Sequence, residues 1–207
     1  MAEAKRPPIN TAKLASDLTS NSNFKNFAHL VALLHDIGKY SHNFQQKLRG
    51  VPSKVDHSTA GAQEAKRLFQ KDDKQRAIST ILAYCIAGHH SGLPNYGSPV
   101  DVEVESTLSA RLKRKIPDYS AYSQEIGISP NDFPTHLPIQ PAIYEYRLFS
   151  ISFFTRMLYS ALVDADFIET ESFMSGGLDW RGGYEDLYKL SQKLNSCLLY
   201  TSPSPRD

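Results

Sequence analysis

The sequence lacks features that would place it in several familiar protein classes. Its 207 residues include only two cysteines, Cys85 and Cys197, and no CxxC pair, which argues against a disulfide framework or a cysteine metal knuckle and favours a reducing cytoplasm. No apolar run approaches the roughly 20 residues of a membrane span, and the polar start lacks the apolar core of a signal peptide. A formal net charge of +1 argues against capture of nucleic acid by the whole surface.

The hydrophobic residues that are present follow helical spacing. They make up 41% of the chain, enough for one substantial core, and no strand alternation or repeat interrupts them. We therefore predict an all-α fold, with Asn10 or Thr11, Ser41 and Asp72 or Asp73 as helix caps. The expected helices cover about 11–18, 24–36, 42–50, 58–70, 73–88, 102–116, 141–168 and 184–194, with 141–168 as the longest and most buried.

Two segments differ from the rest in composition. Residues 93–140 are rich in Pro, Gly, Ser and Tyr, which indicates an insertion or a lid over a site. The helix expected within that segment carries a basic face that could track single-stranded DNA by charge, formed by Arg111, Lys113, Arg114 and Lys115. The alternative is an ordinary solvated face. Residues 196–207 are predicted to be a disordered tail, which we suspect is not native.

Imidazole and carboxylate groups gather at predicted helix ends. The set consists of His35, Asp36, His57, His89, His90 and either Asp164 or Asp166. Such nitrogen and oxygen ligands suit Mn, Fe, Co, Ni, Zn or Mg, and a carboxylate shared by two ions suits phosphodiester hydrolysis. Taken singly, each residue could instead cap a helix or lie in a polar turn.

Four stretches, residues 33–48, 55–62, 86–95 and 162–171, together resemble the HD nuclease domain of the CRISPR-associated type I helicase-nuclease, within the HD superfamily of metal-dependent phosphohydrolases. The match covers about residues 11–171. The resemblance implies an HD-domain helical bundle with a metal pocket at converging helix ends, in a single domain over residues 1–195.

The resemblance also implies roles for individual residues. His35 and Asp36 would bind metal, with Asp36 bridging two ions, and Asp166 would complete the first ion, with Asp164 as the alternative. The remaining implied residues are His57, His89 and His90 on the second ion, Lys39 near the scissile phosphate, and Thr170 on a phosphate or a water. One or two ions of Mn, Ni, Co, Fe or Mg would be the cofactors, with no organic cofactor.

The implied function is hydrolysis of single-stranded DNA during CRISPR interference, in the cytoplasm and away from membranes. The expected partners are the type I surveillance complex and a helicase. Since the chain has no GxxxxGK[ST] phosphate-binding loop, we expect it to be a fragment or a stand-alone subunit.

One departure from the family leaves other functions open. Pro7 stands where the family has an additional histidine, and His29 is displaced from His35 by about 9 Å along the helix and about 120° around it. We expect a weakened first metal site. A docking module with impaired catalysis is therefore an alternative, as is an HD phosphohydrolase that acts on nucleotides or cyclic nucleotides.

Overall fold

The computed structural model describes residues 8–19, 22–52, 55–129, 133–139, 144–177 and 185–201, and all regular elements within these ranges are helices. The predicted all-α fold is confirmed. By its internal contacts the chain divides into two units, Met1–Glu171 and Ser172–Asp207, which are described separately. The first unit contains the candidate site. Its limit coincides with the end of the predicted family match and precedes the predicted domain limit at residue 195.

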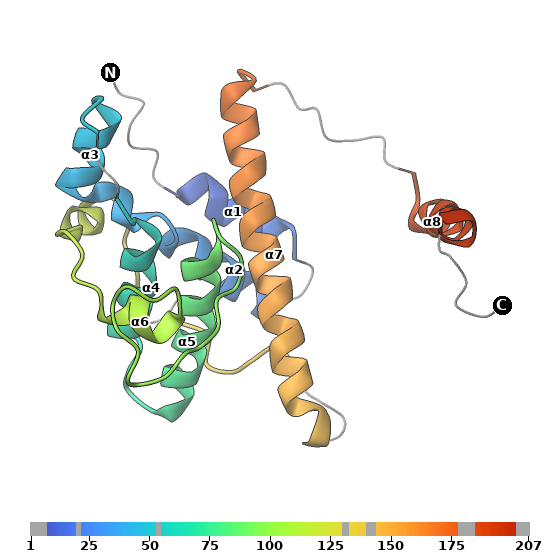
Figure 1. Ribbon diagram of the computed structural model, residues 1–207, viewed down its shortest axis with the longest axis horizontal. Coiled ribbons are helices and arrows are strands. Elements are labelled where there is room, and N and C mark those ends of the chain that lie inside the picture. Colours follow the sequence, from blue (N-terminus) through green and yellow to red (C-terminus); the bar gives the residue numbers. More distant parts are fainter. Residues whose placement is uncertain are drawn as a thin grey trace. The chain divides into compact units, whose positions relative to one another are not determined.

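The first two helices pair with each other at the start of this unit. α1 (Ile9–Asp17) and α2 (Ser22–Leu34) make extensive contact and are drawn in blue in Figure 1. The buried residues of α2 include Phe27, Leu30 and Leu34, spaced three or four apart as predicted. Burial of these residues fixes which face of α2 meets the core. It therefore also sets the direction in which the chain leaves the end of α2.

A single helical turn and a short helix follow α2. They are η1 (Ile37–Tyr40) and α3 (His42–Leu48), and Ser41 caps α3 as predicted by accepting a hydrogen bond from its backbone at 3.4 Å. Gly38 lies inside η1 rather than at a helix end, and its φ is not positive. A Cβ on Gly38 would lie 2.1 Å from the carbonyl oxygen of His57, so glycine is required for close packing.

A second helix pair forms the other half of the core. α4 (Ser58–Leu68) and α5 (Asp73–Gly88) lie side by side, and Asp72 caps α5 as predicted by accepting a 2.8 Å hydrogen bond from its backbone. The small residues of α4 allow a close approach to α2, since a Cβ on Gly61 would lie 2.0 Å from the carbonyl oxygen of Leu34. α4 therefore packs directly against the end of α2.

Residues 89–129 contain little regular structure. Their helices are α6 (Leu108–Lys113) and η2 (Ser120–Gln124), so the prediction of a helix over 102–116 is wrong at both ends. Thr107 caps α6 by accepting a hydrogen bond from its backbone at 3.2 Å, which starts the helix later than the hydrophobic pattern suggests.

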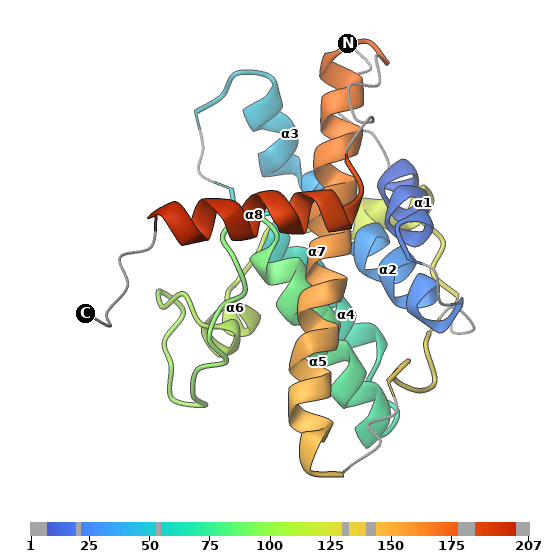
Figure 2. The same cartoon turned by 90° about the vertical axis from the view of Figure 1, so that its right-hand side faces the viewer.

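The longest helix, α7 (Arg147–Met174), lies along α2 and α5 in Figures 1 and 2. It was predicted to be the most buried helix, and that prediction is wrong. Its buried residues form one stripe, composed of Phe154, Leu158, Ala161, Leu162 and Ala165. Phe149 and Phe153 are 71% and 56% exposed. The predicted helix start at residue 141 lies outside the described residues.

Within the described residues, α7 is the one helix long and apolar enough to cross a membrane, a test that core helices of soluble proteins also pass. One side of the helix packs inside the first unit. The Phe154 ring lies 5.2 Å from the ring of Phe24 and 5.0 Å from the ring of Phe27, and the Tyr159 hydroxyl donates to the Gly88 carbonyl at 3.3 Å.

The second unit contains α8 (Leu187–Thr201), which extends beyond the predicted end at residue 194. Residues 196–201 were predicted to be disordered and are helical, so that part of the tail prediction is wrong. Residues 184 and 202–207 lie outside the described residues.

Candidate metal centre

Three chain segments bring the predicted histidines together at helix ends. His35 and Asp36 directly follow α2, His57 directly precedes α4, and His89 and His90 directly follow α5. The fourth segment differs from the prediction, because Asp166 lies within α7, two turns before its end. The predicted convergence of helix ends is therefore confirmed, with one ligand supplied from the side of a helix.

Two of the histidines are oriented by the last turn of the helix that precedes them. The Nδ1 atom of His35 lies 2.6 Å from the carbonyl oxygen of Ala32, and Nδ1 of His89 lies 2.7 Å from that of Ile86. Because a carbonyl oxygen can only accept, Nδ1 carries the proton in both rings. The Nε2 atoms are therefore left to bind a metal, in the manner usual for metal-ligating histidines.

The deeply buried half of the centre consists of His35, His89 and Asp166. His35 Nε2 lies 3.5 Å from Asp166 Oδ1 and 3.2 Å from Asp36 Oδ2, and the side chains of His35 and His89 are almost fully buried. One ligand atom from each of the three residues falls within 4.8 Å of the others. We call this group the inner ligands.

The other half opens toward solvent. Its members are Asp36, His57, His89 and His90, whose ligand atoms also lie within 4.8 Å of one another, and we call them the outer ligands. Asp36 Oδ1 lies 3.4 Å from His57 Nε2 and 3.8 Å from His89 Nε2. The Nε2 atoms of His57 and His90 face each other at 2.8 Å, and the His90 ring is exposed. His89 thus lies within reach of both groups.

Three buried polar atoms indicate that this arrangement suits a metal ion. His35 Nε2, Asp36 Oδ1 and His89 Nε2 are buried and have no hydrogen-bond partner in the described part of the chain. Leaving a buried polar atom without a partner costs about 1–3 kcal/mol, and a charged one costs more. All three are good ligands for divalent ions and belong to the two convergent groups. The donor set therefore fits one or two divalent ions.

The charges of the centre divide its histidines into two kinds. Burial alone would lower the pKa of His35, but the carboxylates of Asp36 and Asp166 outweigh burial and raise it to about 10. Burial lowers the pKa of His57 to about 4 and, with the charge of His35, that of His89 to about 3. Although burial opposes it, His35 keeps the pKa of Asp36 well below its usual value. The neutral rings of His57 and His89 and the ionised carboxylate of Asp36 are in the forms that bind metal, whereas His35 must first lose the proton on Nε2.

Lys39 lies at the open side of the centre and forms an ion pair with Asp36 Oδ2. Its side chain is 39% exposed, so the ammonium group lies at the boundary between the centre and solvent. The predicted proximity of Lys39 to the site is therefore observed, while its role toward a phosphate stays a prediction.

The structure separates the alternatives on α7. Asp166 contacts His35, whereas Asp164 is exposed and lines a small hollow beside Phe24 and Met157. Thr170 is exposed one turn beyond Asp166 and belongs to neither ligand group. His29 is exposed and does not replace the missing histidine, and Pro7 lies outside the described residues.

The predicted DNA-contacting basic face is contradicted for Arg111. This side chain is buried, and its guanidinium donates to residues of α4 and α5. Arg114 pairs with Asp56 at 2.8 Å, and Lys113 donates to backbone carbonyls, including that of Asp101 at 2.8 Å. Arg111 and Arg114 therefore neutralise Asp56 within the same unit, while Lys113 and Lys115 are exposed, so the run of positive charge is solvated only at its two lysines.

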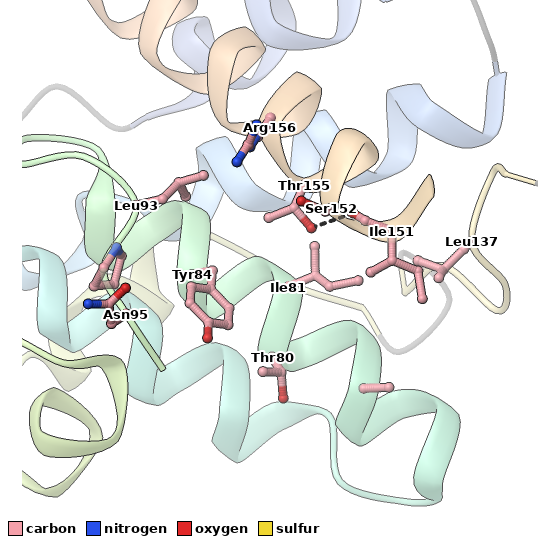
Figure 3. Close-up of a pocket in the computed structure, with 12 residues that line it drawn as sticks. Thr80, Ile81, Tyr84, Leu93, Asn95, Leu137, Ile151, Ser152, Thr155 and Arg156 are labelled. Atoms are coloured by element: carbon pink, nitrogen blue, oxygen red, sulfur yellow. Dashed lines mark hydrogen bonds between the residues drawn. The ribbon is translucent and has the colours of Figure 1, made fainter. Parts of the chain in front are cut away.

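A separate cavity of about 610 Å³ lies between α5, α7 and the loop after His90, and Figure 3 shows its lining. Ile81, Leu93 and Ile151 supply apolar surface, and Arg156 lies at its edge. None of the inner or outer ligands lines it. The cavity is therefore distinct from the candidate metal centre.

Comparison with known proteins agrees with the geometry of the centre. The model of the HD domain family matches residues 6–121, more than half of the chain, and this range contains every ligand except Asp166. No curated protein matches the sequence. The chain belongs to the HD domain family of metal-dependent phosphohydrolases.

Proposed function

We propose that the protein is a metal-dependent nuclease that hydrolyses phosphodiester bonds of single-stranded DNA in CRISPR type I interference. The family gives the reaction class, and the narrower assignment rests on the order and spacing of the four motifs. The surveillance complex, a helicase and a cytoplasmic location belong to the same proposal.

The observation that carries the proposal is the convergence of three unpartnered buried atoms, from His35, Asp36 and His89, with two more histidines on the open side. When bound, one or two divalent ions would lower the pKa of a water molecule and offset the charge of a phosphate displacement. Asp36 lies between the two ligand groups, at contact distance from both His35 and His57.

The protein's own residues can position a phosphate on the open side. His90 and Lys39 border this side, and the ammonium group of Lys39 supplies a positive charge there. In such a position the charge would counter the negative charge that develops on phosphate oxygens. An open border also suits a polymer that passes across the centre, which favours a nuclease over an enzyme for mononucleotides.

The departure at residue 7 supports a second candidate, a docking module with impaired catalysis. Without the family's additional histidine, the inner group offers three ligands, and one of these, His89, also lies in the outer group. On this alternative the chain would join a helicase to a target-bound complex without cutting DNA.

The test pairs metal analysis of the purified protein with cleavage of a circular single-stranded DNA in Mn²⁺ or Ni²⁺. We expect at least one bound ion and endonucleolytic cuts, with slower turnover of mononucleotides and cyclic nucleotides. Faster turnover of nucleotides would favour the other HD phosphohydrolases, and bound metal without any hydrolysis would favour the docking module.

Matched variants assign the activity to the centre. Asp36→Ala should abolish cleavage, and Asp166→Asn should lower metal content, because each removes a carboxylate of the centre. Asp164→Asn is the control, since Asp164 is exposed on the same helix and belongs to neither ligand group. Equal loss of metal in the two α7 variants would contradict the assignment of Asp166.

A further inference from the structure

Arg111 is a buried cation whose hydrogen bonds reach residues that lie next to two different ligands of the metal centre. It is 8% exposed, and its Nε donates to Thr59 Oγ1 at 3.0 Å. Nη2 donates to Ser58 Oγ at 2.6 Å and Nη1 donates to the carbonyl of Ala87. Ser58 and Thr59 directly follow one ligand, and Ala87 comes two residues before another.

The counter-ion of Arg111 also lies beside a ligand. Asp56, the residue before His57, is 3.2 Å from Arg111 Nη2, and it accepts hydrogen bonds from the backbone N of Thr59 at 3.1 Å and the Thr59 hydroxyl at 2.6 Å. Asp56 thereby satisfies a free donor at the start of α4. The His57 side chain makes no cap hydrogen bond and remains available to the centre.

We propose that Arg111 is a positioning residue for the metal centre, which holds His57 in register with His89 and His90. The guanidinium ties the start of α4 to the end of α5 through a planar fork that a single ammonium group cannot reproduce. Metal affinity depends on ligand placement within a few tenths of an ångström, so a loose link would weaken binding. This inference rests on the metal centre proposed above.

The first test compares the Mn²⁺ affinity of Arg111→Lys with that of the unchanged protein by calorimetry, with circular dichroism to confirm folding. We expect affinity to fall about 10- to 100-fold, as is typical when a residue that orients metal ligands is changed. Arg114→Met is the matched control. Arg114 pairs with the same Asp56 but otherwise donates to carbonyls of residues 103 and 105, so affinity should change less than about threefold.

A double-mutant cycle separates positioning from a merely structural role. If Arg111 acts through His57, Arg111→Lys should weaken Mn²⁺ binding in the unchanged protein but have little further effect in a His57→Ala background. Equal weakening in both backgrounds, or unchanged affinity in folded Arg111→Lys, would overturn the inference.

Two further measurements keep the inference testable. If Arg111→Lys fails to fold, Ser58→Ala removes one acceptor of the guanidinium, and we expect a smaller fall in Mn²⁺ affinity of about threefold. An unchanged affinity in that variant would contradict the inference. If the unchanged protein itself binds no Mn²⁺, the proposed function fails, which is distinguishable from failure of the positioning role.

Discussion

Residues 93–129 and α7 both pack on helices that carry metal ligands, but with a different balance of polar and apolar contacts. The irregular segment is attached through buried polar groups, including Arg111 and the hydroxyls of Tyr119 and Tyr122, which donate to Glu64 of α4. α7 is regular and apolar, yet one stripe of five buried residues carries its packing. The two segments therefore allow directional polar contacts to be compared with an apolar stripe.

The two kinds of contact differ in how strictly they fix the positions of the groups that make them. Hydrogen bonds to Glu64 and from Arg111 are directional, so they fix positions sharply and cost much when one partner is lost. Apolar packing on Leu158 and Leu162 is non-directional and tolerates small shifts. Loss of a polar partner should therefore cost more stability than loss of an apolar contact in the stripe, and loss of an exposed side chain should cost least.

Removal of the Glu64 side chain should have the largest effect. Glu64 is 2% exposed, accepts hydrogen bonds from Tyr122 and, at 3.0 Å, from Tyr119, and pairs with Arg67. Glu64→Ala should lower the free energy of unfolding by about 4 kcal/mol, because hydrogen bonds to a charged group contribute about 1.5–3 kcal/mol each. Urea denaturation measures the change in the free energy of unfolding, and a loss below about 1 kcal/mol would show that the polar attachment is weak.

Leu158→Ala should be the next most damaging change. Leu158 is fully buried in the stripe of α7, and Leu→Ala changes in cores cost about 2–5 kcal/mol. We expect a loss of about 3 kcal/mol by urea denaturation. A negligible loss would mean that α7 does not depend on its stripe.

Low pH should weaken the polar attachment of residues 93–129 to α4, because it protonates Glu64. Although burial opposes it, hydrogen bonds from Arg67, Tyr122 and Tyr119 lower the pKa of Glu64 below its usual 4.5. The stabilising contribution is therefore fully present above that value and is lost as the pH falls through the folded-state pKa. The difference in unfolding free energy between the unchanged protein and Glu64→Gln should shrink between pH 6 and pH 3, and a constant difference would contradict the assignment.

The exposed face of α7 should tolerate change best. Phe149 is 71% exposed, so Phe149→Ser should alter the unfolding free energy by less than about 0.5 kcal/mol. It serves as the matched control for Leu158→Ala on the same helix. A loss comparable with that of Leu158→Ala would show that this face is covered.

Local signals in the sequence predicted much of the fold. Ser41 and Asp72 cap the helices they were expected to cap, because the hydrogen bond concerned spans three residues and needs no tertiary partner. The helix ends that carry His35 and His89 were likewise predicted from apolar spacing. Hydrophobic spacing did not show that α7 buries a single stripe, because an all-round apolar pattern does not reveal which face meets a neighbour.

The residues that converge were predicted from the sequence, whereas the contacts that hold them in place were not, and their role as metal ligands stays a prediction. The predicted ligands lie in two convergent groups. The preference for Asp166 rather than Asp164 agrees with the geometry, because Asp166 contacts His35. The role of Arg111 could not be predicted, because its partners lie 24 to 55 residues away in the sequence. The close packing that requires Gly38 could not be predicted either, since the backbone it contacts belongs to a later segment.

The hydrogen bonds from His35 and His89 to carbonyls one turn earlier couple the centre to local opening of the helices. If the last turn of α2 or α5 unwinds, the corresponding ring loses its anchor and turns away with the backbone. By linkage, any ligand that binds the closed turns preferentially must lower the population of the open state. Amide hydrogen exchange in these two turns would therefore follow the occupancy of the centre, residue by residue, without any need for substrate.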